Sequence, residues 1–140
     1  MTIALMTEQT FWAGDDVFAA ADSPTGLYHA VFEDDGETGY FYAVDLVRKL
    51  EIFDAVHIYN VSNVADRDRP SKLSIVWSED GSKCALLINE YPHAVFDFDA
   101  RRGYCRSNFP NYPDPPEQSE STWPSSDHSW SDEAAAWLYR

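Results

Sequence analysis

Residues 27–46 read LYHAVFEDDGETGYFYAVDL and hold the strongest indication of the fold. Two runs of aromatic and β-branched residues lie on either side of the acidic, glycine-containing cluster at 34–36, which is typical of a β-hairpin. The same arrangement recurs where residues 73–78 and 83–89 flank the cluster at 79–82, because glycine supplies the positive φ that such turns require. The sequence therefore predicts two antiparallel hairpins.

Further strands are expected on both sides of the second hairpin. Residues 94–99 alternate most clearly, with the aromatic Phe96 and Phe98 on one face and Asp97 and Asp99 on the other. Residues 52–61 are apolar on both faces, which predicts a central or doubly covered strand. The fold class that follows is mainly β, with antiparallel hairpins or a meander of about seven to eight strands in a sandwich or half-open barrel.

The chain also resembles itself when it is shifted by 45 residues. Phe53-Asp54-Ala55 then aligns with Phe98-Asp99-Ala100, and further identities follow at Val31, Asp35-Gly36, Tyr59 and Asn63. Two explanations of this similarity remain open. One is an internal two-fold repeat of a hairpin with a following strand, and the other is that all hairpins share Asp-Gly turns.

The C-terminal third has a different composition. Residues 110–130 are rich in Pro and Ser and are expected to form a loop. Residues 131–139 are expected to form a short C-terminal α-helix capped by Ser131, with its tryptophan docked on the β-sheet core. We expect one domain over 1–140, with residues 15–110 as its β core.

The charge and the termini limit the classes of partner and location. With 24 Asp and Glu against 10 Lys and Arg, the formal net charge is −14. Such a chain is expected to avoid nucleic acid and to prefer a basic protein. No signal peptide or membrane-spanning run is recognisable, so a soluble, cytoplasmic protein that does not bind membranes is expected. Cys84 and Cys105 are then expected to be reduced and buried.

Four stretches resemble those of a family of small uncharacterised bacterial domains: 22–36 (DSPTGLYHAVFEDDG), 77–81 (WSEDG), 89–98 (NEYPHAVFDF) and 103–110 (GYCRSNFP). The resemblance spans about residues 15–110 and implies a bacterial cytoplasmic protein. It implies no activity, substrate or catalytic residue.

No motif in the chain has the spacing of a known metal, nucleotide or hydrolase site. His29 and His93 both begin the tetrapeptide His-Ala-Val-Phe and precede acidic clusters, so a cation site of histidine and carboxylate is conceivable, although solvated or hydrogen-bonded strand histidines are the simpler interpretation. The acidic turn at 33–37 suggests a hard-cation loop, but it lacks the EF-hand pattern and is expected to be solvated. No cofactor and no metal are expected.

Candidate ligand-binding residues come from the histidines, the paired aspartates and the aromatic excess. Tyr40 and Tyr42 are expected to share one strand face, and His57 and Tyr59 another. The candidate set is His57, Tyr59, His93, Asp97, Asp99 and Arg106.

Three functional hypotheses follow. The first is a non-enzymatic, acidic binding or regulatory domain for a basic protein, which it could neutralise. The second is a small-ligand binder with an aromatic pocket, and the third is a cation-dependent enzyme that uses His93, Asp97 and Asp99 or the acidic turn. The absence of catalytic motifs favours a domain that is not an enzyme.

Overall fold

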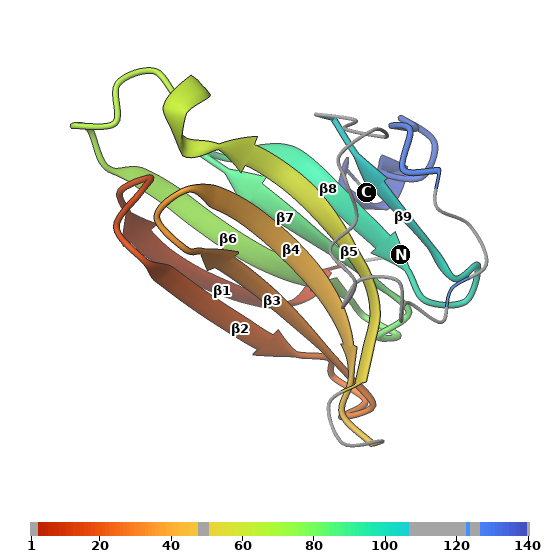
Figure 1. Ribbon diagram of the computed structural model, residues 1–140. Helices are drawn as coiled ribbons and strands as arrows, with labels where there is room; N and C mark the ends of the chain where they lie inside the picture. The colour runs from red at the N-terminus through yellow and green to blue at the C-terminus, as the bar shows by residue number, and fades with distance from the viewer. Residues whose placement is uncertain (1–2, 48–50, 107–122, 124–126, 140) are drawn as a thin grey trace.

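The computed structural model describes residues 3–47, 51–106, 123 and 127–139. These residues form two antiparallel sheets that stack face to face (Figure 1). The four-stranded sheet has the order β2 (Val17–Asp22), β3 (Tyr28–Asp34), β4 (Thr38–Asp45) and β5 (Glu51–Asn60). The five-stranded sheet has the order β1 (Ile3–Phe11), β6 (Ser71–Ser78), β7 (Lys83–Ile88), β8 (Tyr91–Asp97) and β9 (Arg102–Cys105).

The structure confirms the mainly β class. Of the two predicted architectures, it has the sandwich and not the half-open barrel. Both sheets are meanders of consecutive strands, and β1 adds to the second meander by pairing with β6. The sheets approach each other at one side, where the thiol of Cys105 in β9 lies 3.4 Å from the carbonyl oxygen of His57 in β5. No hydrogen-bonded ladder joins β5 to β9 in the described chain, so the barrel is not closed.

Aromatic side chains from the two inner faces fill the space between the sheets. Phe41 stacks on Phe96 across the interface, with ring centroids 5.0 Å apart. The indole N–H of Trp77 donates to the carbonyl oxygen of Ala21 in the opposite sheet over 3.2 Å. These contacts bury large apolar areas, which is the main stabilising contribution in such a fold.

The expected hairpins are present, and their turns use the expected glycines. Gly36 and Gly81 have φ of +96° and +74°, which other residues adopt only with strain. The turn between β8 and β9 instead places Arg101 at φ +55°. Gly103 lies within β9, where a Cβ atom would come 2.8 Å from both Asp54 and Phe96 of facing strands.

The similarity of the chain to itself corresponds to equivalent structure in the two hairpins but not in the strand that follows each of them. An offset of 45 residues places β3 and β4 on β6 and β7. It also places Phe53-Asp54-Ala55, in β5, on Phe98-Asp99-Ala100, which form the turn after β8. The third strand of the proposed repeat is therefore not equivalent in the two sheets.

Strand β5 is an edge strand in its sheet, not a central one. On its inner side, β9 lies beside its edge and Trp123 stacks on Phe53 with centroids 5.8 Å apart. On its outer side Ile52 is 43% exposed, so the expectation of a central or doubly covered strand is wrong.

The C-terminal segment packs on the outer face of the five-stranded sheet, as expected. Trp137 and Ala135 form a second apolar cluster with Val76, Ala85 and Val95 of that face. The helix is a single 3-10 turn, η3 (Ala136–Tyr139), preceded by turns. The Oγ atom of Ser131 accepts the amide hydrogen of Ala134 over 3.2 Å, as a cap would.

Among the described residues, a short 3-10 helix, η1 (Val61–Asn63), also follows β5. Most of the expected loop at 110–130 lies outside the described residues. None of the described helices is long and apolar enough to span a membrane.

Candidate functional site

The outer face of the four-stranded sheet presents an aromatic and apolar surface. Strand register places its side chains in three rows across β2, β3, β4 and β5. We call this surface the open face. It consists of Phe18, Ala20, Asp22, His29, Val31, Glu33, Tyr40, Tyr42, Val44, Ile52, Ala55 and His57.

An aromatic ladder runs along the middle of the open face. Tyr40 stacks on His57 with centroids 5.0 Å apart and on Tyr42 with centroids 5.9 Å apart. Tyr40 and Tyr42 therefore share a face, as the sequence predicted. The Tyr42 hydroxyl donates to Glu33 over 3.5 Å, and burial followed by the charge of Glu33 raises its pKa to about 12. The phenol is neutral at physiological pH and remains a donor.

His57 is held in the ladder as a neutral side chain. Burial is the main cause that lowers its pKa below the ordinary histidine value. Its Nε2 atom lies 3.0 Å from the carbonyl oxygen of Tyr59, so this nitrogen carries the hydrogen and donates it. The ring is only 6% exposed, so it supports Tyr40 from beneath rather than adding accessible area to the face.

The open face is not covered by any described part of the chain, in contrast to the outer face of the other sheet. Its corner residues Phe18 and Ile52 are 64% and 43% exposed. Figure 1 shows β2, β3 and β4 in front, with no described segment crossing them. Exposed aromatic area of this kind is typical of a binding surface.

Charge is distributed unequally between the two sheets. Strands β2 to β5 contain six carboxylates and no lysine or arginine: Asp22, Glu33, Asp34, Asp45, Glu51 and Asp54. The other sheet carries Lys72, Lys83 and Arg102. Of these six carboxylates, Asp22 and Glu33 lie on the open face, which itself carries no lysine or arginine, and this favours the approach of cations.

The candidate residues of the sequence analysis lie in several places. His57 belongs to the open face, but Tyr59 points into the sandwich and donates to Asp34 over 2.6 Å. The expectation that these two residues share a face is wrong, because the pairing register shifts between Gly39 and Tyr40 and one extra residue of β5 is inserted.

His93 and Arg106 are neighbours in the five-stranded sheet. The guanidinium of Arg106 lies between the rings of Tyr91 and Trp130, at 4.5 and 4.0 Å from their centroids. Its Nε donates to the carbonyl oxygen of Pro92 over 2.6 Å. Burial, and then the charge of Arg106, lower the pKa of His93. These contacts tie the C-terminal segment to β8.

Asp97 and Asp99 do not form a carboxylate pair on one strand. Asp97 ends β8 opposite Lys83, whereas Asp99 lies in the exposed turn that follows. The structure thus separates the six candidates into the open face, the core, the Arg106 cluster and the end of β8. It assembles no single site from them.

Asp34 and Asp35 of the acidic turn at residues 33–37 accept hydrogen bonds that hold the protein's own structure. Asp34 is 1% exposed and accepts hydrogens from the Gly14 amide, the Gly36 amide and Tyr59 over 2.6–2.8 Å. Backbone hydrogen bonds from Thr38 and Glu37 lower the pKa of Asp35. Within the described ranges, no group of three or more His, Cys, Asp or Glu could hold a metal ion.

The remaining histidines pair with carboxylates of other elements. His29 pairs with Asp22 across β2 and β3, on a different sheet from His93, so these two do not meet. His128 pairs with the buried Asp54 over 2.9 Å, a contact between residues 74 apart that no sequence pattern indicated. Both cysteines are buried thiols, as expected, and burial raises the pKa of Cys84.

The fold and its surfaces define an all-β protein of the two-sheet sandwich class, with one aromatic face that the described residues leave uncovered. The chain belongs to the family described as "Uncharacterized protein conserved in bacteria (DUF2251)", which matches residues 11–139. This confirms the resemblance found in the sequence and extends it over the C-terminal segment.

A curated relative is an uncharacterized protein of Haemophilus influenzae (strain ATCC 51907 / DSM 11121 / KW20 / Rd), which is 42% identical to this chain. The match covers 69% of this chain and 65% of the relative, so it spans less than two thirds of the relative's length. No solved structure matches.

Proposed function

We propose that this protein is a non-enzymatic binding domain that docks a basic protein on the open face. The observation that carries the proposal is the coincidence of two features on one surface. The face is aromatic and uncovered by described residues, and its four strands contain no lysine or arginine.

The two features have separate roles in the proposed complex. Exposed Phe18 and the half-buried rings of Tyr40 and Tyr42, which buried His57 supports, offer rigid area that loses little conformational entropy on binding. The carboxylates accelerate the encounter and select partners of opposite charge. A second copy of this chain is a poor occupant, because each copy carries a formal charge of −14.

A regulatory role follows from the same chemistry. A basic protein whose cationic surface is covered by this face can no longer bind nucleic acid or other anions, so the domain would neutralise it. We place this activity in the bacterial cytoplasm, where Cys84 and Cys105 remain reduced.

The test uses the full chain as bait in extract of its own cells, at low and at high salt. Phe18→Ser removes apolar area, and Glu33→Lys reverses charge in the middle of the open face. Tyr139→Ser and Asp99→Lys are matched controls, since both residues are exposed and lie off the face.

Support requires a basic protein that is retained at low salt, released at high salt, lost by both face variants and kept by both controls. Hydrogen exchange on the purified complex should then show protection in β2 to β5. The proposal fails if no protein is retained at low salt, or if the face variants retain it as well as the controls do.

A further inference from the structure

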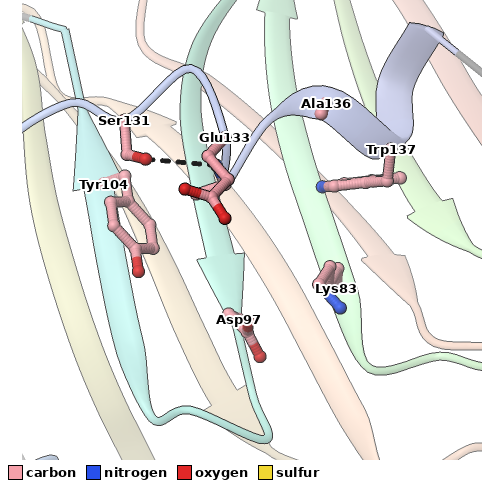
Figure 2. Close-up of a pocket in the computed structure, with 8 residues that line it drawn as sticks. Lys83, Asp97, Tyr104, Ser131, Glu133, Ala136 and Trp137 are labelled. Atoms are coloured by element: carbon pink, nitrogen blue, oxygen red, sulfur yellow. Dashed lines mark hydrogen bonds between the residues drawn. The ribbon is translucent and has the colours of Figure 1, made fainter.

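A second recess lies on the other side of the molecule, between the C-terminal segment and the outer face of the five-stranded sheet. It has a volume of about 380 Å³ and is open to solvent on one side. Strands β7, β8 and β9 form its floor, and residues 131–137 form its wall (Figure 2). The residues that matter here are Lys83, Asp97, Tyr104, Glu133, Ala136 and Trp137.

One polar group in the wall has no partner. Trp137 is 5% exposed, and its indole Nε1–H finds no acceptor in the part of the chain that the structure describes. A buried N–H group without an acceptor is rare in native proteins and destabilising. Figure 2 shows this nitrogen on the side of the ring that faces Glu133 and the interior of the recess.

Two opposite charges lie side by side on the floor, with no ion pair between them in the described chain; Asp97 also accepts the Ala100 amide hydrogen over 3.0 Å. Lys83 and Asp97 are cross-strand partners in β7 and β8, so their Cβ atoms lie about 5 Å apart. No described carboxylate lies within ion-pair distance of Lys83. By contrast, Lys72 of the same sheet face bonds Glu90 over 2.8 Å.

The lining excludes the simplest ligands. A plain anion would meet the carboxylates of Asp97 and Glu133, and a plain cation would meet the ammonium of Lys83. A ligand with a positive and a negative group a short distance apart can pair with both the lysine and the carboxylates of the lining. The volume is at the small end of the range for ligand sites, which suits a molecule of the size of one amino acid.

We propose that this recess binds a free α-amino acid. Its carboxylate accepts hydrogens from Lys83 and from the indole N–H of Trp137, and its ammonium group donates to Asp97 and Glu133. Its side chain lies against Tyr104 and Ala136. The site is separate from the open face and needs no protein partner.

The test follows the indole ¹H–¹⁵N resonance of Trp137 in the full chain, assigned by its loss in Trp137→Phe. The standard L-amino acids are added singly at millimolar concentration. We expect at least one of them to move this resonance in a saturable manner. Its N-acetyl derivative, which lacks the ammonium, and its amide, which lacks the carboxylate, should each bind about tenfold more weakly or worse.

Variants then assign the contacts. Lys83→Met and Asp97→Asn should each weaken binding by about tenfold or more, because each removes a charge-assisted hydrogen bond. Lys72→Met is the matched control and should bind normally, since this lysine is outside the recess. Thermal melts verify that each variant is folded.

The inference is overturned if no amino acid moves the Trp137 resonance, or if the N-acetyl derivative binds as well as the free amino acid. It is also overturned if Lys83→Met and Lys72→Met behave alike. None of these outcomes bears on protein binding at the open face, which is measured with other variants.

Discussion

Asp34 is the most informative single position for stability, because its buried carboxylate joins three separate parts of the chain. One oxygen accepts from the Gly14 amide and the Tyr59 hydroxyl over 2.7 and 2.6 Å, and the other accepts from the Gly36 amide over 2.8 Å. The β1–β2 turn, the β3–β4 turn and β5 are thereby held together. We propose Asp34→Asn as the perturbation, since it keeps the shape and removes the charge.

The size of the effect depends on two opposing contributions. Asparagine retains one acceptor oxygen, so at best two donors stay satisfied and the third faces an NH2 group. Hydrogen bonds to a charged group are worth about 1.5–3 kcal/mol each, against about 1 kcal/mol for neutral ones. Relief of carboxylate desolvation offsets part of this loss. We expect a net destabilisation of about 3 kcal/mol, which lowers the Tm by about 10 °C for a chain of this size.

The assay is urea unfolding followed by circular dichroism, where Asp34→Asn should lower the midpoint without changing the m-value. Glu33→Gln is the control, because it changes the net charge equally at an exposed neighbouring position. Tyr59→Phe removes one donor and should cost less than Asp34→Asn, and the double variant should be less than additive. If Asp34→Asn were as stable as Glu33→Gln within about 0.5 kcal/mol, the assignment of Asp34 as a structural link would be wrong.

Three further outcomes are expected. Burial lowers the pKa of His57 and His93 below the ordinary value of 6.5, so the unfolded chain binds protons first on acidification and stability falls as the pH drops through that value. A His57→Gln/His93→Gln variant should show a smaller loss of Tm between about pH 7.5 and about pH 5.5 than the unaltered chain, and equal losses would contradict the assignment. Trp137→Ala removes the 5% exposed ring that covers Val76 and Val95, and it should cost about 3 kcal/mol in urea unfolding; an unchanged midpoint would show that the segment is not needed. Added monovalent salt shortens the screening length from about 30 Å to about 8 Å and should raise the Tm of this chain of charge −14, whereas a fall in Tm would show that self-repulsion is not dominant.

The sequence predicted those parts of the fold that depend on neighbouring residues. Asp-Gly turns and alternating aromatic residues located the hairpins around Gly36 and Gly81, because turn geometry is decided within a few residues. Strand β2, whose sequence is VFAAAD, was not identified, since alanine has little β propensity, although Ala19 and Ala21 are part of the core between the sheets. The turn at Asn89-Glu90, with both φ positive, was not apparent without a glycine.

The sites were less predictable because they depend on contacts between distant residues. The recess combines β7, β8 and β9 with a wall more than 25 residues further along the chain, and only Asp97 of its lining was a candidate. Asp34 was assigned to a solvated turn, although Gly14 and Tyr59 cover it. A local acidic pattern does not distinguish a buried carboxylate from an exposed one, because the donors come from elsewhere in the sequence.

The pairing of β1 with β6 has a consequence for synthesis in the cell. β1 is made first among the strands, yet its partners, from Ser71 opposite Phe11 to Ser78 opposite Ile3, are made 60 or more residues later. At translation rates of about 5–20 residues per second, this interval lasts roughly 3–15 s. A hairpin needs far less time to form. The β2–β5 meander can therefore assemble on the ribosome while β1 still has no partner. During that interval an unpaired strand carrying Ile3 and Met6 is available to chaperones, and its late insertion is the step at which newly made chains are most prone to aggregate.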